Sequence, residues 1–278
     1  MPHRKQVPFL LALLEDDTPA VQDHIVAELM AFGPQLEGLV RPLWTELDAR
    51  QQQRLKEVLA QMAAKRLADS WLAWLEEPDF HLALEQAMIS LSEQEYGPLA
   101  RSLSSWLNEL ADQFDRHHGT PHALSFMQFL FEDQQFVCVS ETQQTHEHHL
   151  LHHLRRTRTG SPMALTCLAL LVGGRVGIDL HGIFIRGHFM SIACQNPHLQ
   201  MYNAHDGGKP LSRSSALYME EALRRNCTWP SEMRAPVFEI VRQLLHEVID
   251  SLPANRAKRY QALLHELRRE LRRRDLID

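Results

Sequence analysis

The longest apolar run of the chain, Met163 to Gly174, restricts the fold more than any other feature. Ser161 is a typical helix N-cap, and Pro162 suits the first helical position because the N–H that it lacks would have no partner there. The pair Gly173-Gly174 is typical of a helix end. The sequence therefore predicts a buried helix from Pro162 to about Val172. Crossing a bilayer requires about 20 apolar residues, so we expect no membrane span.

Composition indicates a soluble globular protein. The chain has 278 residues, of which 44% are hydrophobic and 23% are charged, values typical of one or two domains. Its beginning lacks a basic stretch followed by an apolar core and a cleavage site, so we expect a cytoplasmic protein without a signal peptide. The cysteines are widely spaced and form no CxxC pair, which predicts reduced thiols. They are Cys138, Cys167, Cys194 and Cys227.

Helical patterns fill the first part of the sequence. Thr18-Pro19 and Thr120-Pro121 each predict a helix start, and Ser92 and Glu95 have the spacing of a capping box. We expect helices at about residues 7–16, 19–33, 48–75, 92–114 and 121–131. Two similar segments, LALLED from Leu11 and WLAWLEE from Trp71, indicate stacked helices of the HEAT type.

The pattern changes after Gln135, where β-prone segments begin. A short strand at 136–139 and a helix at 145–156 precede predicted strands at 183–185, 188–193 and 199–204. The sequence Gln195-Asn-Pro-His198 forms turns, so it predicts a hairpin between the last two strands. A helical half followed by mixed elements predicts an α+β, mostly helical fold.

Cys167 decides between two kinds of function. A nucleophilic thiolate activated by a helix belongs in the first turn, where free N–H groups and the helix dipole lower the thiol pKa. Cys167 lies beyond that turn, among leucines such as Leu165 and Leu168, and burial there would favour the neutral thiol. We therefore predict a core role for Cys167. Its use as a nucleophile is the less favoured alternative.

The predicted hairpin gathers polar residues on one face of a sheet. If Gln195 pairs with His198, then His188 faces His205 and Met190 faces Asn203. A histidine beside an amide on adjacent strands, next to a helix N-terminus, is the layout of a papain-like or transglutaminase-like site. The alternative is a structural histidine at a strand edge.

Two further motifs carry weaker predictions. HEHHLLHH, which begins at His146, would place histidines one helical turn apart, a spacing that can hold a divalent metal. No nearby cysteine or acidic pair completes such a site, so we expect a solvated helix without metal or cofactor. In NAHDGG the paired glycines predict a turn that Asp206 could cap, and phosphate binding by Gly207-Gly208 is a weak alternative.

The end of the chain is a basic segment on an acidic protein. From Asn255 to Asp278 there are eight Arg or Lys and four acids, a local charge of +4, whereas the whole chain carries −6. Apolar residues from Tyr260 to Leu271 recur at helical spacing and predict an amphipathic helix docked on the body. The arginine face is a less favoured candidate for nucleic acid. It consists of Arg268, Arg269, Arg272, Arg273 and Arg274.

Several short motifs in order resemble one family. The run RTRTGSPMALTCLALLVGGRVGIDLHGIFIRGHFMSI, followed by NAHDGGKPLS, resembles the transglutaminase-like family of bacterial proteins named after the SirB invasion-gene regulator. That family shows R-x-G-x-P-x-S-L, then G-H-F, then D-P-F-x-G-G. The resemblance extends over about residues 9–215 and implies a cysteine-protease-like core behind a helical N-terminal region. Many relatives end in tetratricopeptide-type helices, of which this chain shows no clear repeat.

The resemblance also implies roles for single residues. The segment from Pro162 corresponds to the helix that bears the nucleophile in active transglutaminases, and counting back from Gly177 puts the nucleophile's position at Pro162. His188 matches the catalytic histidine, and Asn203 matches the position of the aspartate. Ala164 replaces the serine that is usual in the family. Because proline cannot attack a carbonyl, we expect no catalytic residue, and the candidates for a binding face are His188, Asn203, His205 and Asp206.

We therefore expect a catalytically silent transglutaminase-like protein, a cytoplasmic module that binds or scaffolds another protein and has a regulatory role. The alternative is a thiol-dependent amidase, protease or acyltransferase in which Cys167 or Cys194 acts with His188. We expect three parts, namely a HEAT-like helical region at 1–118, the transglutaminase-like domain at 119–218 and C-terminal helices at 219–278.

Overall fold

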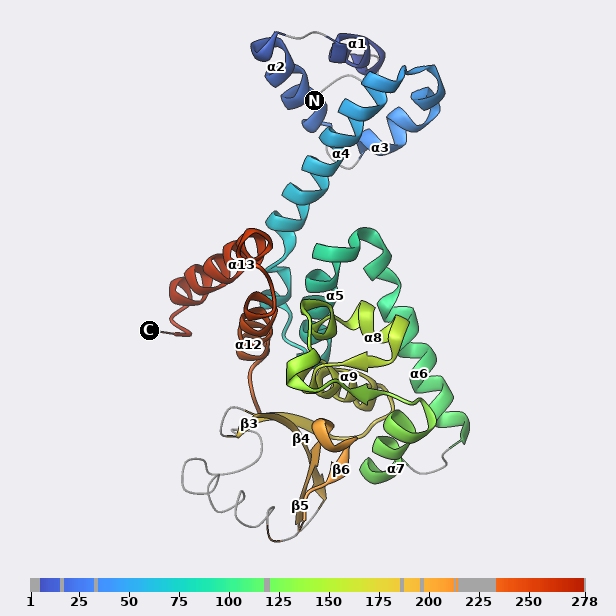
Figure 1. Cartoon of the computed structure of the whole chain (residues 1–278), viewed down its shortest axis with the longest axis vertical. Helices are drawn as coiled ribbons and strands as arrows, with labels where there is room; N and C mark the ends of the chain where they lie inside the picture. The colour runs from blue at the N-terminus through green and yellow to red at the C-terminus, as the bar shows by residue number, and fades with distance from the viewer. Residues whose placement is uncertain are drawn as a thin grey trace. The chain divides into compact units, whose positions relative to one another are not determined.

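The protein divides into two compact units, residues 1–70 and residues 71–278, in a computed structural model (Figure 1). The structure describes residues 6–15, 18–32, 35–117, 121–185, 188–195, 198–212, 214 and 234–277. Each unit has a hydrophobic core of its own. Helices dominate both units, and the strands all lie in the second, so the predicted α+β, mostly helical class is confirmed for the described chain.

The first unit is built from helices whose starts the sequence marks. Its helices are α1 (Val7–Ala12), α2 (Pro19–Met30), α3 (Gln35–Val40) and α4 (Ala49–Ser70). Thr18 occupies the N-cap position of α2, as predicted. The Asp48 carboxylate accepts the backbone N–H groups of Arg50 and Gln51 at 2.7 and 2.9 Å and so caps α4.

The second unit begins with helices that surround a central one. They are α5 (Phe80–Tyr96), α6 (Leu103–His117), α7 (Ala123–Gln128) and α8 (Leu151–Thr157). The predicted helix start at Ser92 is wrong, because Ser92 is buried inside α5. The true start is Asp79, whose carboxylate accepts the N–H of Leu82 at 2.8 Å. Gly97, with a φ of 54°, follows the end of α5.

The central helix of the second unit is α9 (Pro162–Arg175), which is the predicted buried helix. Ser161 caps it, with Oγ accepting the N–H of Ala164 at 3.2 Å. The predicted end at Gly173-Gly174 is wrong, since α9 continues to Arg175. These glycines serve close packing instead. A Cβ on Gly173 would lie 2.9 Å from Leu180, and one on Gly174 would lie 2.7 Å from the His81 ring.

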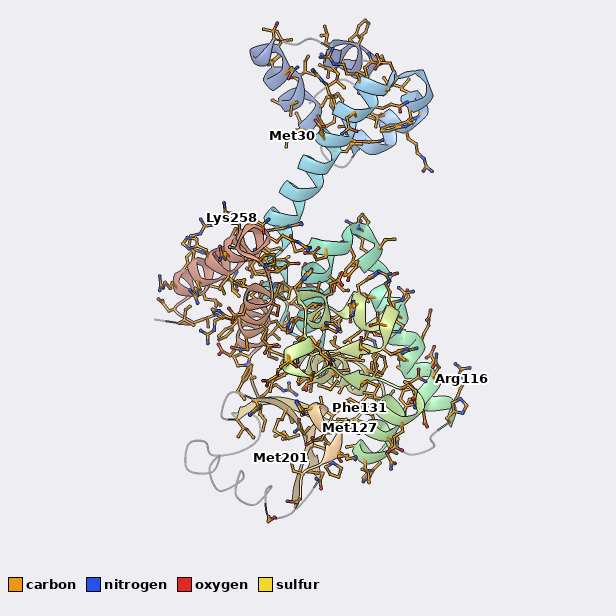
Figure 2. All side chains as sticks on the ribbon, viewed as in Figure 1. Met30, Arg116, Met127, Phe131, Met201 and Lys258 are labelled. Carbon is orange, nitrogen blue, oxygen red and sulfur yellow. The ribbon has the colours of Figure 1, made fainter. Side chains whose placement is uncertain are left out.

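The strands β3 (Leu180–Ile185), β4 (His188–Gln195), β5 (His198–Asn203) and β6 (Lys209–Pro210) form an antiparallel sheet in that order. The predicted pair of Gln195 with His198 is confirmed, and the ladder continues to Ser191 and Tyr202. The pairs predicted beyond it are not part of this ladder. Asn203 pairs with Lys209 on the other edge of β5, and residues 204–206 make a 3₁₀ turn. Met201 lies in a small apolar cluster on the sheet with Met190 and Ile192 (Figure 2).

A two-stranded parallel ladder holds the start of α9. It joins β1 (Val137–Cys138) to β2 (Thr159–Gly160). Gly160 is required there, because a Cβ would lie 2.6 Å from Leu154. The predicted helix at 145–156 is wrong in its first half. Residues His146–His149 form a 3₁₀ turn, Leu150 is extended, and α8 begins only afterwards.

The C-terminal helices α12 (Val237–Asp250) and α13 (Ala254–Arg273) belong to the second unit, where they pack beside α5 (Figure 1). The Tyr260 hydroxyl donates to Glu95 at 3.1 Å, and the Trp71 indole donates to Glu266 at 3.0 Å. The apolar stripe of α13 is buried in the main core, as predicted. The three-part division at 118 and 218 stays a prediction. Among the described helices, none is long and apolar enough to span a membrane.

If α13 is part of the core, its buried leucines must contribute to stability. Leu267→Ala removes a fully buried side chain and should lower the free energy of unfolding by about 2–5 kcal/mol. The matched control is Leu276→Ala, whose side chain is 46% exposed and whose loss should cost about 0.5 kcal/mol or less. Urea denaturation followed by circular dichroism measures both, and equal effects would contradict the packing described here.

Candidate functional site

A cavity of about 450 Å³ lies where the first turn of α9 meets the ends of other elements. Its wall comes from four parts of the second unit: the segment before α8, the start of α9, strands β3 and β4, and the end of α12. The lining residues are Glu141, Gln144, His149, Pro162, Met163, Phe184, His188, Phe189, Glu247, Asp250 and Ser251.

The start of α9 brings backbone groups, but no thiol, to this cavity. Pro162 and Met163 line it, and neither carries a nucleophile. Ser161 is fully buried and already accepts the N–H of Ala164. Thr166, one turn further on, donates to the carbonyl of Pro162 at 2.8 Å. The first turn is therefore fixed in place by hydrogen bonds, and Pro162 and Met163 are the residues of this turn that line the cavity.

Cys167 is fully buried in the main core, as predicted. Burial raises the pKa of its thiol far above the ordinary value, and the charge of Glu247 raises it further. Burial also raises the pKa of Cys138 to about 11, with a smaller contribution from Asp206. The side chain of Cys194, and Cys227, lie outside the part of the chain that the structure describes. Neither described thiol is therefore prepared to ionise near neutral pH.

Of the four residues that were predicted to form one binding face, only His188 lines the cavity. His188 is exposed and lines the cavity, together with Pro162. Asn203 caps a turn instead: its side-chain oxygen accepts the N–H of His205 at 3.0 Å, and its amide donates to Asp206 at 3.1 Å. None of these three lines the cavity. Within the described ranges, no hydrogen bond joins Asn203 to His188.

Sequence reasoning missed a buried histidine that joins two walls of the cavity. His149 is 2% exposed; its Nε2 lies 3.2 Å from Oγ of Ser251, and its Nδ1 lies 3.1 Å from Oε2 of Glu247. The order of these atoms is that of a serine triad. However, the Ser251 hydroxyl donates to the backbone carbonyl of Glu247 at 2.7 Å, and Nδ1 lacks hydrogen-bond geometry toward any described group. The arrangement is that of an anchor between two segments.

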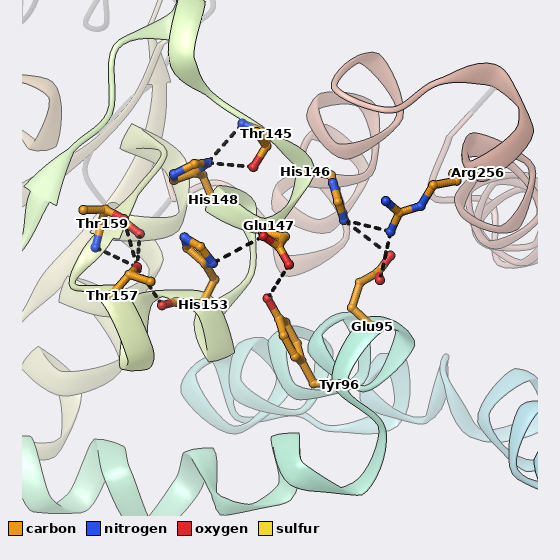
Figure 3. A network of polar contacts seen from close by, with 10 residues as sticks. All are labelled: Glu95, Tyr96, Thr145, His146, Glu147, His148, His153, Thr157, Thr159 and Arg256. Carbon is orange, nitrogen blue, oxygen red and sulfur yellow. Dashed lines mark hydrogen bonds and ion pairs between the residues drawn. The ribbon is translucent and has the colours of Figure 1, made fainter.

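Three other histidines of the HEHHLLHH segment, His146, His148 and His153, each have a polar partner of their own (Figure 3). His146 lies 3.3 Å from Arg256 and 3.6 Å from Glu95. His148 bonds Thr145, and His153 lies 3.8 Å from Glu147. Because the segment is not one continuous helix, the predicted one-turn spacing does not arise. Among the described side chains, no group of three is placed to hold a metal ion.

The arginines of α13 are largely engaged within the second unit. Arg273 and Arg274 bond Glu270 at 2.8 and 2.7 Å, and Arg268 lies 3.0 Å from the His246 ring. Arg269 pairs with Glu266 at 3.9 Å. These contacts leave less free positive charge on this face than the sequence indicated. Binding of nucleic acid there stays the less favoured prediction.

Comparison with known protein families identifies the fold behind this cavity. The profile described as "Transglutaminase-like superfamily" matches residues 99–245, more than half of the chain. The protein belongs to the transglutaminase-like superfamily. Comparisons with curated proteins and with solved structures gave no match. The matched region of this transglutaminase-like protein includes α9, the sheet and most of α12. The lining residues Glu247, Asp250 and Ser251 lie beyond its last residue, and the other lining residues lie within it.

The buried histidines predict a loss of stability in acid. Burial lowers the pKa of His152, and the charges of Arg155 and Arg156 lower it further. Burial also lowers the pKa values of His146, His148 and His153. A lowered pKa means that the unfolded chain binds more protons than the folded one. The stability that the neutral histidine contributes is therefore complete above its unfolded pKa of 6.5. It is lost as the pH falls through the lower pKa of the folded state.

His152→Phe tests this directly. The His152 ring lies 4.2 Å from the Tyr96 ring, and its buried Nδ1 has no partner among the described groups, so phenylalanine can keep the contact without the proton. We expect a smaller fall in unfolding free energy between about pH 7 and pH 5 than in the wild type. His265→Phe, an exposed position on α13, is the matched control. Identical pH profiles for His152→Phe and the wild type would refute the prediction.

Proposed function

We propose that this transglutaminase-like protein is catalytically silent in thiol chemistry and acts as a module that binds or scaffolds another protein, with a regulatory role in the cytoplasm. The observation that carries the proposal is the residue at the start of α9. In the arrangement of a helix-activated thiol, the nucleophile stands in the first turn. Here Pro162 occupies that turn beside His188 in the wall of one cavity, and Cys167 is buried behind it.

The resemblance to the SirB-type family supports the same proposal. By this resemblance, Pro162 corresponds to the position of the nucleophile and His188 to the catalytic histidine. A histidine that keeps its place beside a pocket without a nucleophile favours recognition over turnover. A pocket of about 450 Å³ falls in the size range of sites that bind a side chain or a small group. Binding a segment of a partner protein is a function that this pocket could have without a nucleophile.

The alternative is a thiol enzyme in which another cysteine acts with His188. If Cys167 were the nucleophile, its thiol would have to reach the cavity and ionise, although it is buried and its pKa is raised. Cys194 lies in β4, where it pairs with Leu199 near the hairpin turn. It is three residues along the sequence from Pro197 and six from His188, toward the opposite end of the strand from His188. The geometry therefore favours neither cysteine as the partner of His188.

The reactivity of the native thiols distinguishes these functions. We expect Cys167 to react with iodoacetamide only on unfolding, at every pH from about 5 to 9, because it is inaccessible and its pKa is raised. Peptide mass spectrometry measures the rate for each cysteine, with the same protein in urea as the control for peptide recovery. A native cysteine that reacts faster than a free thiol, and that reacts more slowly in His188→Ala, would support the thiol-enzyme alternative.

Activity on glutamine provides a second test. We expect neither the wild type nor His188→Ala to release ammonia from glutamine-containing peptides or to link them to amines, because none of the residues that line the cavity is a cysteine. An active transglutaminase assayed in parallel is the positive control, and circular dichroism checks that the variant is folded. A wild-type rate that disappears in His188→Ala would refute the proposal.

A further inference from the structure

The cavity wall carries carboxylates that are not paired with any described lysine or arginine. Glu141, Glu247 and Asp250 line it, and none of the lining residues is Lys or Arg. Among the described residues, no Lys or Arg forms an ion pair with any of the three. Carboxylates elsewhere in this unit do have such partners. Glu93, for example, bonds Arg101 at 2.8 Å, and Glu239 bonds Arg242 at 2.9 Å.

A buried polar group beside these carboxylates also lacks a partner. His149 lines the cavity and is 2% exposed, yet its Nδ1 makes no hydrogen bond to any described group. It faces the Glu247 carboxylate at 3.1 Å, while Nε2 is held by Ser251. The imidazole thus keeps Glu247 at a defined place in the wall. Buried polar atoms without partners are uncommon in folded proteins, and one in a cavity wall points to a ligand.

Another part of the wall is aromatic. Phe184 on β3 and Phe189 on β4 pack with their ring centroids 4.8 Å apart, and both line the cavity. Gly182 leaves room for this pair, because a Cβ there would lie 2.5 Å from the Phe189 ring. A cation held near carboxylates and an aromatic ring is stabilised by both. The guanidinium of arginine suits such a site best, because it is planar, is weakly hydrated and can bond a carboxylate through two N–H groups.

We propose that this cavity binds the side chain of an arginine presented by a partner protein. The inference rests on the proposed binding function and names the chemistry of the partner segment. The guanidinium bonds Glu247 and Asp250 at the end of α12, Glu141 adds charge from the facing segment, and the Phe184 ring packs against the planar group or its methylene stem. His188 borders the same opening and contacts the main chain of the bound segment.

The test uses the full chain and three synthetic peptides. The probe is acetyl-Gly-Gly-Arg-Gly-Gly-amide, and its counterparts carry citrulline, the uncharged isostere of arginine, or lysine at the central position. Binding is followed by the amide and histidine-ring signals in nuclear magnetic resonance titrations. We expect saturable shifts with the arginine peptide and an affinity at least about ten times lower for citrulline. Raising the salt concentration should weaken arginine binding and leave citrulline binding nearly unchanged.

Variants locate the site. Asp250→Asn and Glu141→Gln change exposed carboxylates, so the fold should tolerate them, and each should lower the affinity by roughly threefold or more. Glu247→Gln should act more strongly but disturbs the anchor at His149. The matched control, Glu109→Gln, is exposed on α6, outside the cavity, and should bind like the wild type.

Equal affinity for citrulline or lysine, a control variant as weak as the cavity variants, or no saturable shift would overturn the proposal. These results can be distinguished from results that would refute the proposed function. Ammonia release that depends on His188 would refute the proposal of catalytic silence, whether or not the arginine peptide binds. Loss of arginine binding without such activity would refute only the inference about the partner.

Discussion

The burial of α9 is the constraint on which the second unit depends. A helix that is apolar on every side needs neighbours on every side, and α5, α6, α8 and the sheet supply them. Pro162 and Met163, at its start, line the cavity, because the Ser161 cap and the β1–β2 ladder hold the first turn at the edge of the core. Any chemistry of this unit at the helix must therefore come from Pro162 or Met163, or from residues that other segments bring there.

The C-terminal helices complete the site as well as the core. The end of α12 supplies Glu247, Asp250 and Ser251 to the cavity wall, and the stripe on α13 fixes α12 against α5 through Tyr260 and its neighbours. The basic composition of the tail is explained by pairing within the unit, for example between Arg273 and Glu270. The amphipathic helix that the sequence predicts to dock on the body is thus packed against the helix that supplies part of the cavity wall.

Local sequence patterns predicted most helices and strands, whereas the cavity depends on contacts between segments that are far apart in the sequence. The apolar run, the Ser161 cap, the turn at Gln195 and the tail stripe depend on spacing within a few residues, and the structure confirms them. The start at Ser92 was wrong because a capping-box spacing also occurs inside a longer helix, where burial in the core outweighs it. The wall formed by Glu141, His149 and Glu247 could not be predicted, since about a hundred residues separate its two parts.

The charge of the cavity bears on both proposals. A thiolate at the start of a helix is stabilised by the helix dipole and by neighbouring cations. Carboxylates close to such a position act in the opposite direction, because each would raise the pKa of a thiol placed there. Glu141, Glu247 and Asp250 therefore oppose thiolate chemistry at this helix start even apart from Pro162. The same three carboxylates attract a cation, so the feature that argues against an acyl-transfer enzyme is the one that argues for recognition of a basic side chain.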